Sequence, residues 1–295
     1  MPHRNRIVAY VFVAPAFALI ALFVLWPTAS CVYTSIHATP LAGRDLGRFI
    51  ALGNYADLLE DPAFARSVVN TVFFTLLVVP GQAGLALLLA LWVNKPGWSR
   101  RIMRLCVFIP TAMSLTVLSV VWKLLYEPAS ATGAGLINGL LSGLALPGQP
   151  FLTSTGQAMP AIVVMSIWQG VGLQMVILLA ALQAVPAQLY EASTLDGAGR
   201  FRRFWHVTLP GIAPTAALVV MITTILALKL FVQPFLMTRG GPGGSTMSIV
   251  QYIYEAAFYR RDLGLACAAG TLFFIMVSGV TGLLRWLSAK AEAMT

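Results

Sequence analysis

Long apolar stretches separated by shorter polar ones dominate this 295-residue chain. A helix needs roughly 20 mostly apolar residues to cross the hydrocarbon core of a bilayer. Six stretches are long enough, and they predict transmembrane helices at about Ile7–Tyr33, Ser67–Val93, Leu105–Leu125, Met159–Val185, Thr208–Met237 and Gly264–Leu284. The pattern therefore indicates an all-α, polytopic membrane protein in contact with membrane lipid. We expect a single transmembrane domain over residues 1–295.

Composition and charge support this class and orient the chain. Hydrophobic residues make up 58% of the sequence and charged residues 10%, and the mean hydropathy is +0.82, which excludes an ordinary soluble domain. Eleven Lys and Arg residues lie in the connections on one side, 1–6, 94–104, 186–207 and 285–295. The longer connections on the other side hold six, in 34–66, 126–158 and 237–263. The positive-inside rule therefore places both termini in the cytoplasm.

The same distribution argues against several kinds of site. The basic residues form no continuous stripe, so no nucleic-acid partner is expected. The three cysteines and three histidines lack the paired spacing of a metal or redox centre. A glycine-rich run at 240–244 lacks the Gly-Lys-Ser/Thr that completes a phosphate-binding loop. We therefore expect this chain to bind no nucleotide, cofactor or metal, and to be no enzyme.

The cytoplasmic connection between the fourth and fifth spans has the pattern of a folded element. Pro186 suits the first position of a helix, and the residues of Ala187–Leu195 are mostly good helix formers. Asp196 and Gly197 should stop this helix, because glycine readily adopts the left-handed conformation that closes one. A second helix should follow, and Pro210 should end it.

The second helix is amphipathic. Its apolar face is formed by residues at positions i, i+3, i+4 and i+7, namely Phe201, Phe204, Trp205 and Thr208. Arginines mark its other side. An amphipathic helix-turn-helix at a membrane surface fits a groove of a partner protein. The alternative reading is a solvated loop lying among the lipid headgroups.

This connection resembles the "EAA" loop in the membrane subunits of binding-protein-dependent ABC importers. The matching residues are Glu191, Ala192, Asp196, Gly197, Ala198, Leu209 and Pro210, while Ser193 and Val207 depart from the usual Ala and Ile. The resemblance implies the type I ABC importer permease fold, with a coupling loop at 186–210. It also implies that this loop contacts a cytoplasmic ATPase, through Glu191, Ala192, Ser193, Asp196, Gly197, Ala198, Arg202 and Phe204.

Further stretches resemble the carbohydrate-transporting members of this family. They are the Gly-Gly-Pro run at 240–242 with the Thr, Tyr and Ala-Phe positions after it, and the Leu-Gly-Asn-Tyr run at 52–55. The resemblance implies import of a carbohydrate or glycerophosphate-type solute across a bacterial inner membrane by alternating access. The implied partners are a second homologous permease, an ATPase dimer that binds ATP and Mg, and an extracytoplasmic solute-binding protein.

Four polar residues within the predicted spans are candidates for the solute path. Lys229 lies in the fifth span with Gln233 one turn later, and Gln169 and Gln174 lie in the fourth. Polar groups turned toward lipid lack partners, so we expect these side chains to face the interface with the second permease. As alternatives, Lys229 extends to the membrane surface or pairs with a neighbouring subunit.

An ion-coupled secondary transporter of a small polar solute is the alternative function. Such proteins keep acidic residues or broken helices in mid-membrane, often in repeated halves. Here all ten Asp and Glu residues fall in or near predicted loops, and no internal repeat is visible. The sequence therefore favours the ABC importer subunit. A membrane enzyme is disfavoured because no nucleophile, base or metal cluster is in reach of another.

Overall fold

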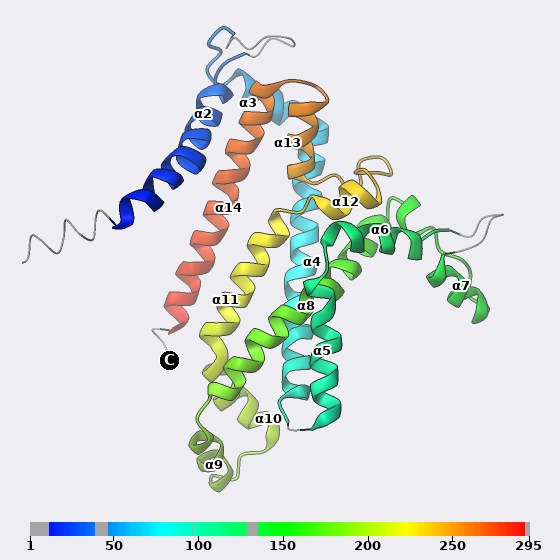
Figure 1. Cartoon of the computed structure of the whole chain (residues 1–295), viewed down its shortest axis with the longest axis vertical. Helices are drawn as coiled ribbons and strands as arrows, with labels where there is room; N and C mark the ends of the chain where they lie inside the picture. The colour runs from blue at the N-terminus through cyan, green and yellow to red at the C-terminus, as the bar shows by residue number, and fades with distance from the viewer. Residues whose placement is uncertain (1–11, 39–46, 96, 129–134, 293–295) are drawn as a thin grey trace, which may run out of the picture. The chain divides into compact units, whose positions relative to one another are not determined.

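The computed structural model describes residues 12–38, 47–95, 97–128 and 135–292, and these are almost entirely helical (Figure 1). The elements are η1 Ala21–Leu25, α2 Trp26–Ser35, α3 Gly53–Glu60, α4 Pro62–Val93, α5 Trp98–Ala112, α6 Leu115–Leu125, α7 Leu136–Gly143, η2 Phe151–Thr153, α8 Ala158–Ala184, α9 Ala187–Leu195, α10 Arg200–Arg203, η3 Phe204–Thr208, α11 Leu209–Leu228, α12 Val232–Met237, α13 Ile249–Phe258 and α14 Leu263–Glu292. The two ends of the chain, predicted to be cytoplasmic, lie outside the described residues.

Five helical segments in the described residues are long and apolar enough to cross a membrane. They are Phe12–Ser35, Pro62–Val93, Ala158–Ala184, Arg200–Met237 and Leu263–Lys290. These correspond to five of the six predicted spans, and the predicted start of the first span at Ile7 lies outside the described residues. A sixth span is reached only if the bent pair α5 and α6 is counted as one.

The third span, predicted over Leu105–Leu125, is a bent pair of helices in the structure. Helix α5 begins earlier and ends at Ala112, and α6 leaves it at an angle of 101°. Met113 and Ser114 between them have extended backbone, with ψ values of 152° and 126°. Pro110 has no N–H to donate within the last turn of α5, and serine is favoured immediately before a helix, so the chain breaks here at low cost.

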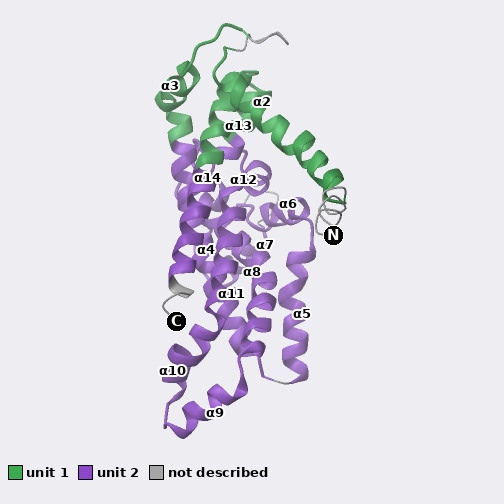
Figure 2. Cartoon of the chain, turned by 90° about the vertical axis from the view of Figure 1, so that its left-hand side faces the viewer, with its two compact units in different colours: residues 1–65, 252–275 green, residues 66–251, 276–295 purple. Residues whose placement is uncertain are grey.

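The described helices form two compact units (Figure 2). Residues 1–65 and 252–275 make the first unit, and residues 66–251 and 276–295 make the second. The expected single domain over 1–295 stays a prediction.

In the first unit, Asn54 is buried at the start of α3, and its Nδ2 donates to the carbonyl oxygens of Ser35 at 2.8 Å and His37 at 3.0 Å. Through Asn54, the Leu-Gly-Asn-Tyr run at 52–55 therefore holds the segment that follows α2 in place.

A charged cluster joins the two halves of the first unit. Asp61, between α3 and α4, accepts hydrogen bonds from the Tyr252 hydroxyl at 2.7 Å and from Nη1 of Arg260 at 3.0 Å. The Ala63 amide also donates to Asp61 at 2.8 Å. Burial opposes ionisation of Asp61, but these hydrogen bonds together hold its pKa below the ordinary value of 3.8. The same burial and the Asp61 carboxylate raise the pKa of Tyr252.

Replacing Asp61 with asparagine should destabilise the first unit by about 1–2 kcal/mol, because Tyr252 loses a charged acceptor. A lowered carboxyl pKa contributes stability that is fully present above the unfolded-state pKa and is lost as pH falls through the folded-state pKa. The stability difference between Asp61→Asn and the original protein should therefore persist from about pH 5 to 8 and shrink below about pH 4. Thermal unfolding of the two purified proteins across this pH range measures the stability difference. Glu60→Gln, at an exposed neighbouring carboxylate, is the control and should change nothing.

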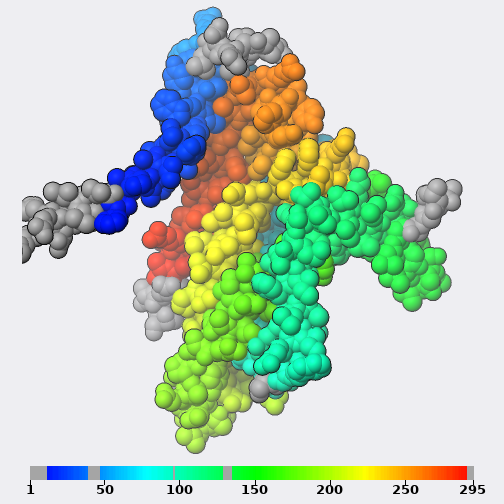
Figure 3. Space-filling model, in the orientation of Figure 1, coloured from blue at the N-terminus to red at the C-terminus, as the bar shows by residue number. Residues whose placement is uncertain are grey.

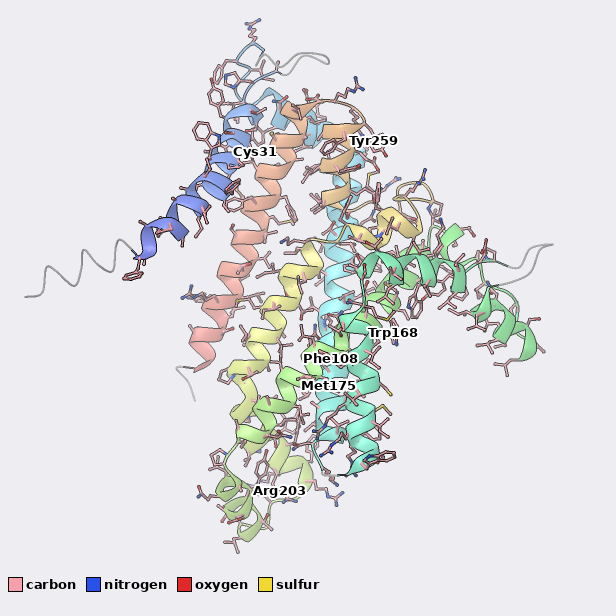
Figure 4. All side chains as sticks on the ribbon, in the orientation of Figure 1. Cys31, Phe108, Trp168, Met175, Arg203 and Tyr259 are labelled. Carbon is pink, nitrogen blue, oxygen red and sulfur yellow. The ribbon has the colours of Figure 1, made fainter. Side chains whose placement is uncertain are left out.

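Close packing of α8 against α4, α5 and α11 forms the core of the second unit. Small residues allow the helices to approach: Ala86 and Ala90 of α4 are fully buried, and a Cβ at Gly172 would lie 2.3 Å from the Val107 carbonyl oxygen of α5. Figure 4 shows Phe108 of α5 and Met175 of α8 in this region. One apolar cluster lies toward the α9 end of these helices, and another lies toward α12.

The predicted orientation can be tested by cysteine labelling. In a variant without the three native cysteines, a cysteine at Ser142 in α7 should react with a membrane-impermeant maleimide in intact cells. A cysteine at Arg202 in α10 should react only after the membrane is opened. Reaction of the Arg202 probe in intact cells would reverse the orientation inferred from the basic residues.

Candidate functional site

The connection between α8 and α11 begins with the predicted short helix. Helix α9 has the predicted bounds, Ala187–Leu195, and it ends in a hydrogen-bonded cap: Ala198 N donates to the Ser193 carbonyl at 2.9 Å and Gly197 N donates to the Thr194 carbonyl at 3.1 Å. This pair of bonds requires a left-handed residue, and Gly197 has a φ of +72°. The helix-stopping role predicted for Gly197 is confirmed.

The second half of the connection differs from the prediction. Pro210 does not end the second helix; α10, the π-helical turn η3 and α11 follow one another without a gap, and a single segment runs from Arg200 into the membrane. Pro210 lies two residues after the π-helical turn η3, and because it has no N–H it cannot donate a hydrogen bond to the preceding turn. The predicted amphipathic helix is therefore the first part of the helical segment that continues as α11.

Two side-chain hydrogen bonds connect the halves of the loop. Nη1 of Arg203 donates to Oγ1 of Thr194 at 3.1 Å, and the hydroxyls of Tyr190 and Thr208 lie 3.1 Å apart. Figure 4 shows Arg203 at this end of the second unit. The Ser193 hydroxyl donates to the Tyr190 carbonyl at 2.8 Å, so the departure from the usual alanine is accommodated within α9.

The surface of this loop is both polar and apolar. Among the residues predicted to contact an ATPase, Glu191, Ala192, Asp196, Gly197 and Arg202 are exposed, and Ser193, Ala198 and Phe204 are partly exposed. Leu195 and Phe201 project beside them with exposed fractions of 89% and 78%. Two large apolar side chains are thus exposed beside the charged residues of the loop. Leu195 is absent from the predicted set, although its position beside the Asp-Gly stop places it at the tip.

All four residues predicted for the solute path line one cavity in the second unit. The cavity has a volume of about 360 Å³ and lies among α4, α5, α6, α8, α11 and α12. Its polar lining residues are Gln82, Thr111, Ser166, Gln169, Gln174, Thr223, Lys229 and Gln233. Apolar side chains complete its wall. This composition, a mainly apolar pocket with a few polar groups, is typical of small-molecule sites.

A hydrogen-bond network links three helices across this cavity. Nε2 of Gln174 donates to Oε1 of Gln82 and to Oγ1 of Thr223, both at 2.7 Å, and Nε2 of Gln82 donates to the Ser166 carbonyl at 2.6 Å. Oε1 of Gln174 is buried and has no hydrogen-bond partner in the described residues. An unsatisfied buried acceptor costs about 1–3 kcal/mol.

Lys229 lies where the fifth span is interrupted. Helix α11 ends at Leu228 and α12 begins at Val232, so the lysine is the residue immediately after the last turn of α11. Its side chain is exposed and lines the cavity, together with the buried Gln233 of α12. A cation is favoured near the C-terminus of a helix, which carries partial negative charge. The location explains how a charge is kept within this span.

Residues 50–292 match the model of the family described as "Binding-protein-dependent transport system inner membrane component". This chain belongs to that family of ABC importer permeases. The permease is therefore a multi-pass protein of the bacterial inner membrane and is not itself an enzyme; ATP is bound by the ATPase of the importer. The ion-coupled secondary transporter, kept as the alternative from the sequence, is wrong.

Similar proteins cover nearly the whole permease. It is 35% identical to the sulfoquinovosyl glycerol transport system permease protein SmoG of Agrobacterium fabrum over 97% of this chain and 92% of that one. It is 29% identical to the sn-glycerol-3-phosphate transport system permease protein UgpA of the same organism, over 94% and 93%. A bacterial alginate ABC transporter in complex with an alginate pentasaccharide-bound periplasmic protein aligns with a TM-score of 0.82 at 21% identity, covering 98% of the permease and 96% of that chain.

Gln82 is the amide side chain of the cavity that the sequence predictions missed. Gln82 lies in α4 and is 7% exposed. A Cβ on Gly170 of α8 would lie 2.2 Å from Nε2 of Gln82. The signal was available, because an amide within an apolar span flanked by Gly81 and Gly84 needs a partner inside the protein. The glycine at position 170 is what allows the Gln82 side chain to cross to α8.

Proposed function

We propose that this permease forms, together with a second homologous permease, the translocation path for a carbohydrate or glycerophosphate-type solute. The observation that carries the proposal is the convergence of amide, hydroxyl and ammonium groups on one cavity among otherwise apolar helices. Amides and hydroxyls can donate to and accept from solute hydroxyls, and Lys229 can pair with an acidic group. The relatives' names support this, since two of them specify glycerol compounds.

We propose further that residues 186–210 dock one subunit of an ATPase dimer. Exposed Leu195 and Phe201 would enter an apolar groove of the ATPase, and Glu191 would meet a basic or hydrogen-bonding group there. An extracytoplasmic binding protein would deliver the solute. Alternating access then follows when ATP-driven closure of the ATPase dimer moves the loop.

Reconstitution tests this function. The permease, co-purified with its second permease and ATPase and placed in proteoliposomes with the binding protein, should accumulate radiolabelled sn-glycerol-3-phosphate or a disaccharide only when ATP is supplied on the ATPase side. Competition between the two labelled solutes identifies the class. Accumulation driven by a proton gradient without ATP would contradict the proposal.

A further inference from the structure

A second cavity lies at the turn between α4 and α5, apart from the solute path. It has a volume of about 300 Å³ and is lined by Gly97, Trp98, Arg101 and Arg104. The turn lies at the same end of the second unit as α9 and α10 (Figure 3). By the distribution of Lys and Arg, this end faces the cytoplasm.

The positive charge of this pocket is not compensated by carboxylates. In the described part of the chain neither Arg101 nor Arg104 forms an ion pair, and the sequence has no Asp or Glu from residue 62 to residue 126. Nη2 of Arg104 donates to the Val93 carbonyl at 2.5 Å, which holds the guanidinium in place. Its Nε is buried and has no hydrogen-bond partner in the described residues. The pocket is thus lined by two guanidinium groups without an ion-pair partner in the described residues, one of them held in place by the Val93 carbonyl.

An exposed apolar stripe starts at the same pocket. Trp98, Ile102, Leu105 and Ile109 follow one another at helical spacing along α5, and Trp98 and Leu105 have exposed fractions of 77% and 60%. Arg101 lies one turn from both Trp98 and Leu105, so its charge borders the stripe. A phosphate held by the arginines would therefore have a ready surface for hydrocarbon chains running along the helix.

We propose that this pocket binds the phosphate headgroup of an anionic phospholipid of the cytoplasmic leaflet. Guanidinium groups provide charge-assisted hydrogen bonds to phosphate oxygens. Basic pockets between transmembrane helices on the cytoplasmic side bind such headgroups. The apolar stripe favours a lipid over a soluble protein, because it extends about three turns along α5 into the depth where acyl chains lie.

The test is native mass spectrometry of the purified full-length permease, titrated with phosphatidylglycerol, with phosphatidylcholine of the same acyl chains, and with inorganic phosphate. Arg101→Gln is the main variant, because the Arg101 side chain makes no hydrogen bond within the described chain and its loss should leave the fold intact. A double variant, Arg101→Gln with Arg104→Gln, removes both charges. Arg285→Gln, at an exposed arginine near the end of α14, is the matched control.

Phosphatidylglycerol affinity should fall about fivefold in Arg101→Gln, further in the double variant, and not at all in Arg285→Gln. Phosphatidylcholine should bind weakly to every form. Equal phosphatidylglycerol affinity in the original and double-variant proteins would overturn the proposal. So would displacement of the lipid by inorganic phosphate alone, which indicates a free-anion site. Loss of ATPase co-purification with unchanged lipid affinity would instead identify a protein-docking surface.

Discussion

Replacing Gly197 with aspartate is expected to reduce solute-stimulated ATP hydrolysis by the reconstituted importer at least about tenfold while the permease still inserts in the membrane. Gly197 holds the left-handed conformation that closes α9, and a side chain there costs about 1–2 kcal/mol of strain. Apart from its two sequence neighbours, no atom of the described residues lies within 4 Å of a Cβ at Gly197, so the new carboxylate would project toward the proposed ATPase surface. The backbone strain and the added charge both act on the proposed contact between the loop and the ATPase.

Gly199→Asp separates these two effects. Gly199 has an ordinary φ of −67° and equally open surroundings, so aspartate there adds charge without backbone strain. We expect it to retain most of the stimulation. Equal losses at both positions would show that charge rather than helix closure matters, and normal stimulation in Gly197→Asp would contradict the docking role of the loop.

Reversing the charge of Glu191 is a second test of the proposed contact between the 186–210 loop and the ATPase. Glu191 is exposed and its carboxylate forms no ion pair or hydrogen bond with the described residues of this chain, so the carboxylate is available to a partner. Glu191→Lys should detach or uncouple the ATPase, and Glu191→Gln should have a smaller effect because the amide still accepts hydrogen bonds. Co-purification distinguishes detachment from uncoupling.

Converting Lys229 to methionine should lower solute uptake about tenfold or more at low solute concentration, because a hydrogen bond to a charged group contributes about 1.5–3 kcal/mol. The complex should still assemble and hydrolyse ATP, since Lys229 lies in the cavity and not in the docking loop. Uptake by proteoliposomes across a range of solute concentrations measures the change.

Lys123→Met is the control for this prediction. Lys123 is an exposed lysine of α6 that does not line the cavity with Gln174, and its replacement should leave uptake unchanged. Unchanged uptake in Lys229→Met would contradict a role in solute binding and would favour the alternative that Lys229 extends to the membrane surface. A loss for an acidic solute with no loss for a neutral sugar would show that the ammonium group pairs with an anion.

Local signals made the helical start of the 186–210 loop predictable. Pro186 before α9 and the Asp-Gly pair after it act on the backbone of their immediate neighbours, so the bounds Ala187–Leu195 follow from the sequence. The cavity was predictable for another reason: amides and a lysine within apolar spans must turn away from lipid. Lys229, Gln233, Gln169 and Gln174 meet in the structure for that reason.

The failures also have physical causes. Proline commonly ends a helix, but here the helical path continues through the π-helical turn η3 and Pro210 into α11, which the local sequence does not indicate. The bend between α5 and α6 interrupts a stretch whose apolar character never changes, so hydropathy cannot locate it. Which side chain reaches Gln174 depends on the close approach at Gly170, a tertiary feature without a periodic pattern.

The unbroken helical path from Arg200 to Leu228 makes that segment a lever arm. At 1.5 Å per residue it is roughly 40 Å long, so a tilt of about 5° at the cytoplasmic end moves the far end by about 3–4 Å. That displacement exceeds the 2.7 Å separation between Gln174 and Thr223. A small rotation of the loop, transmitted along this segment, is therefore enough to lengthen the hydrogen bond between Gln174 and Thr223.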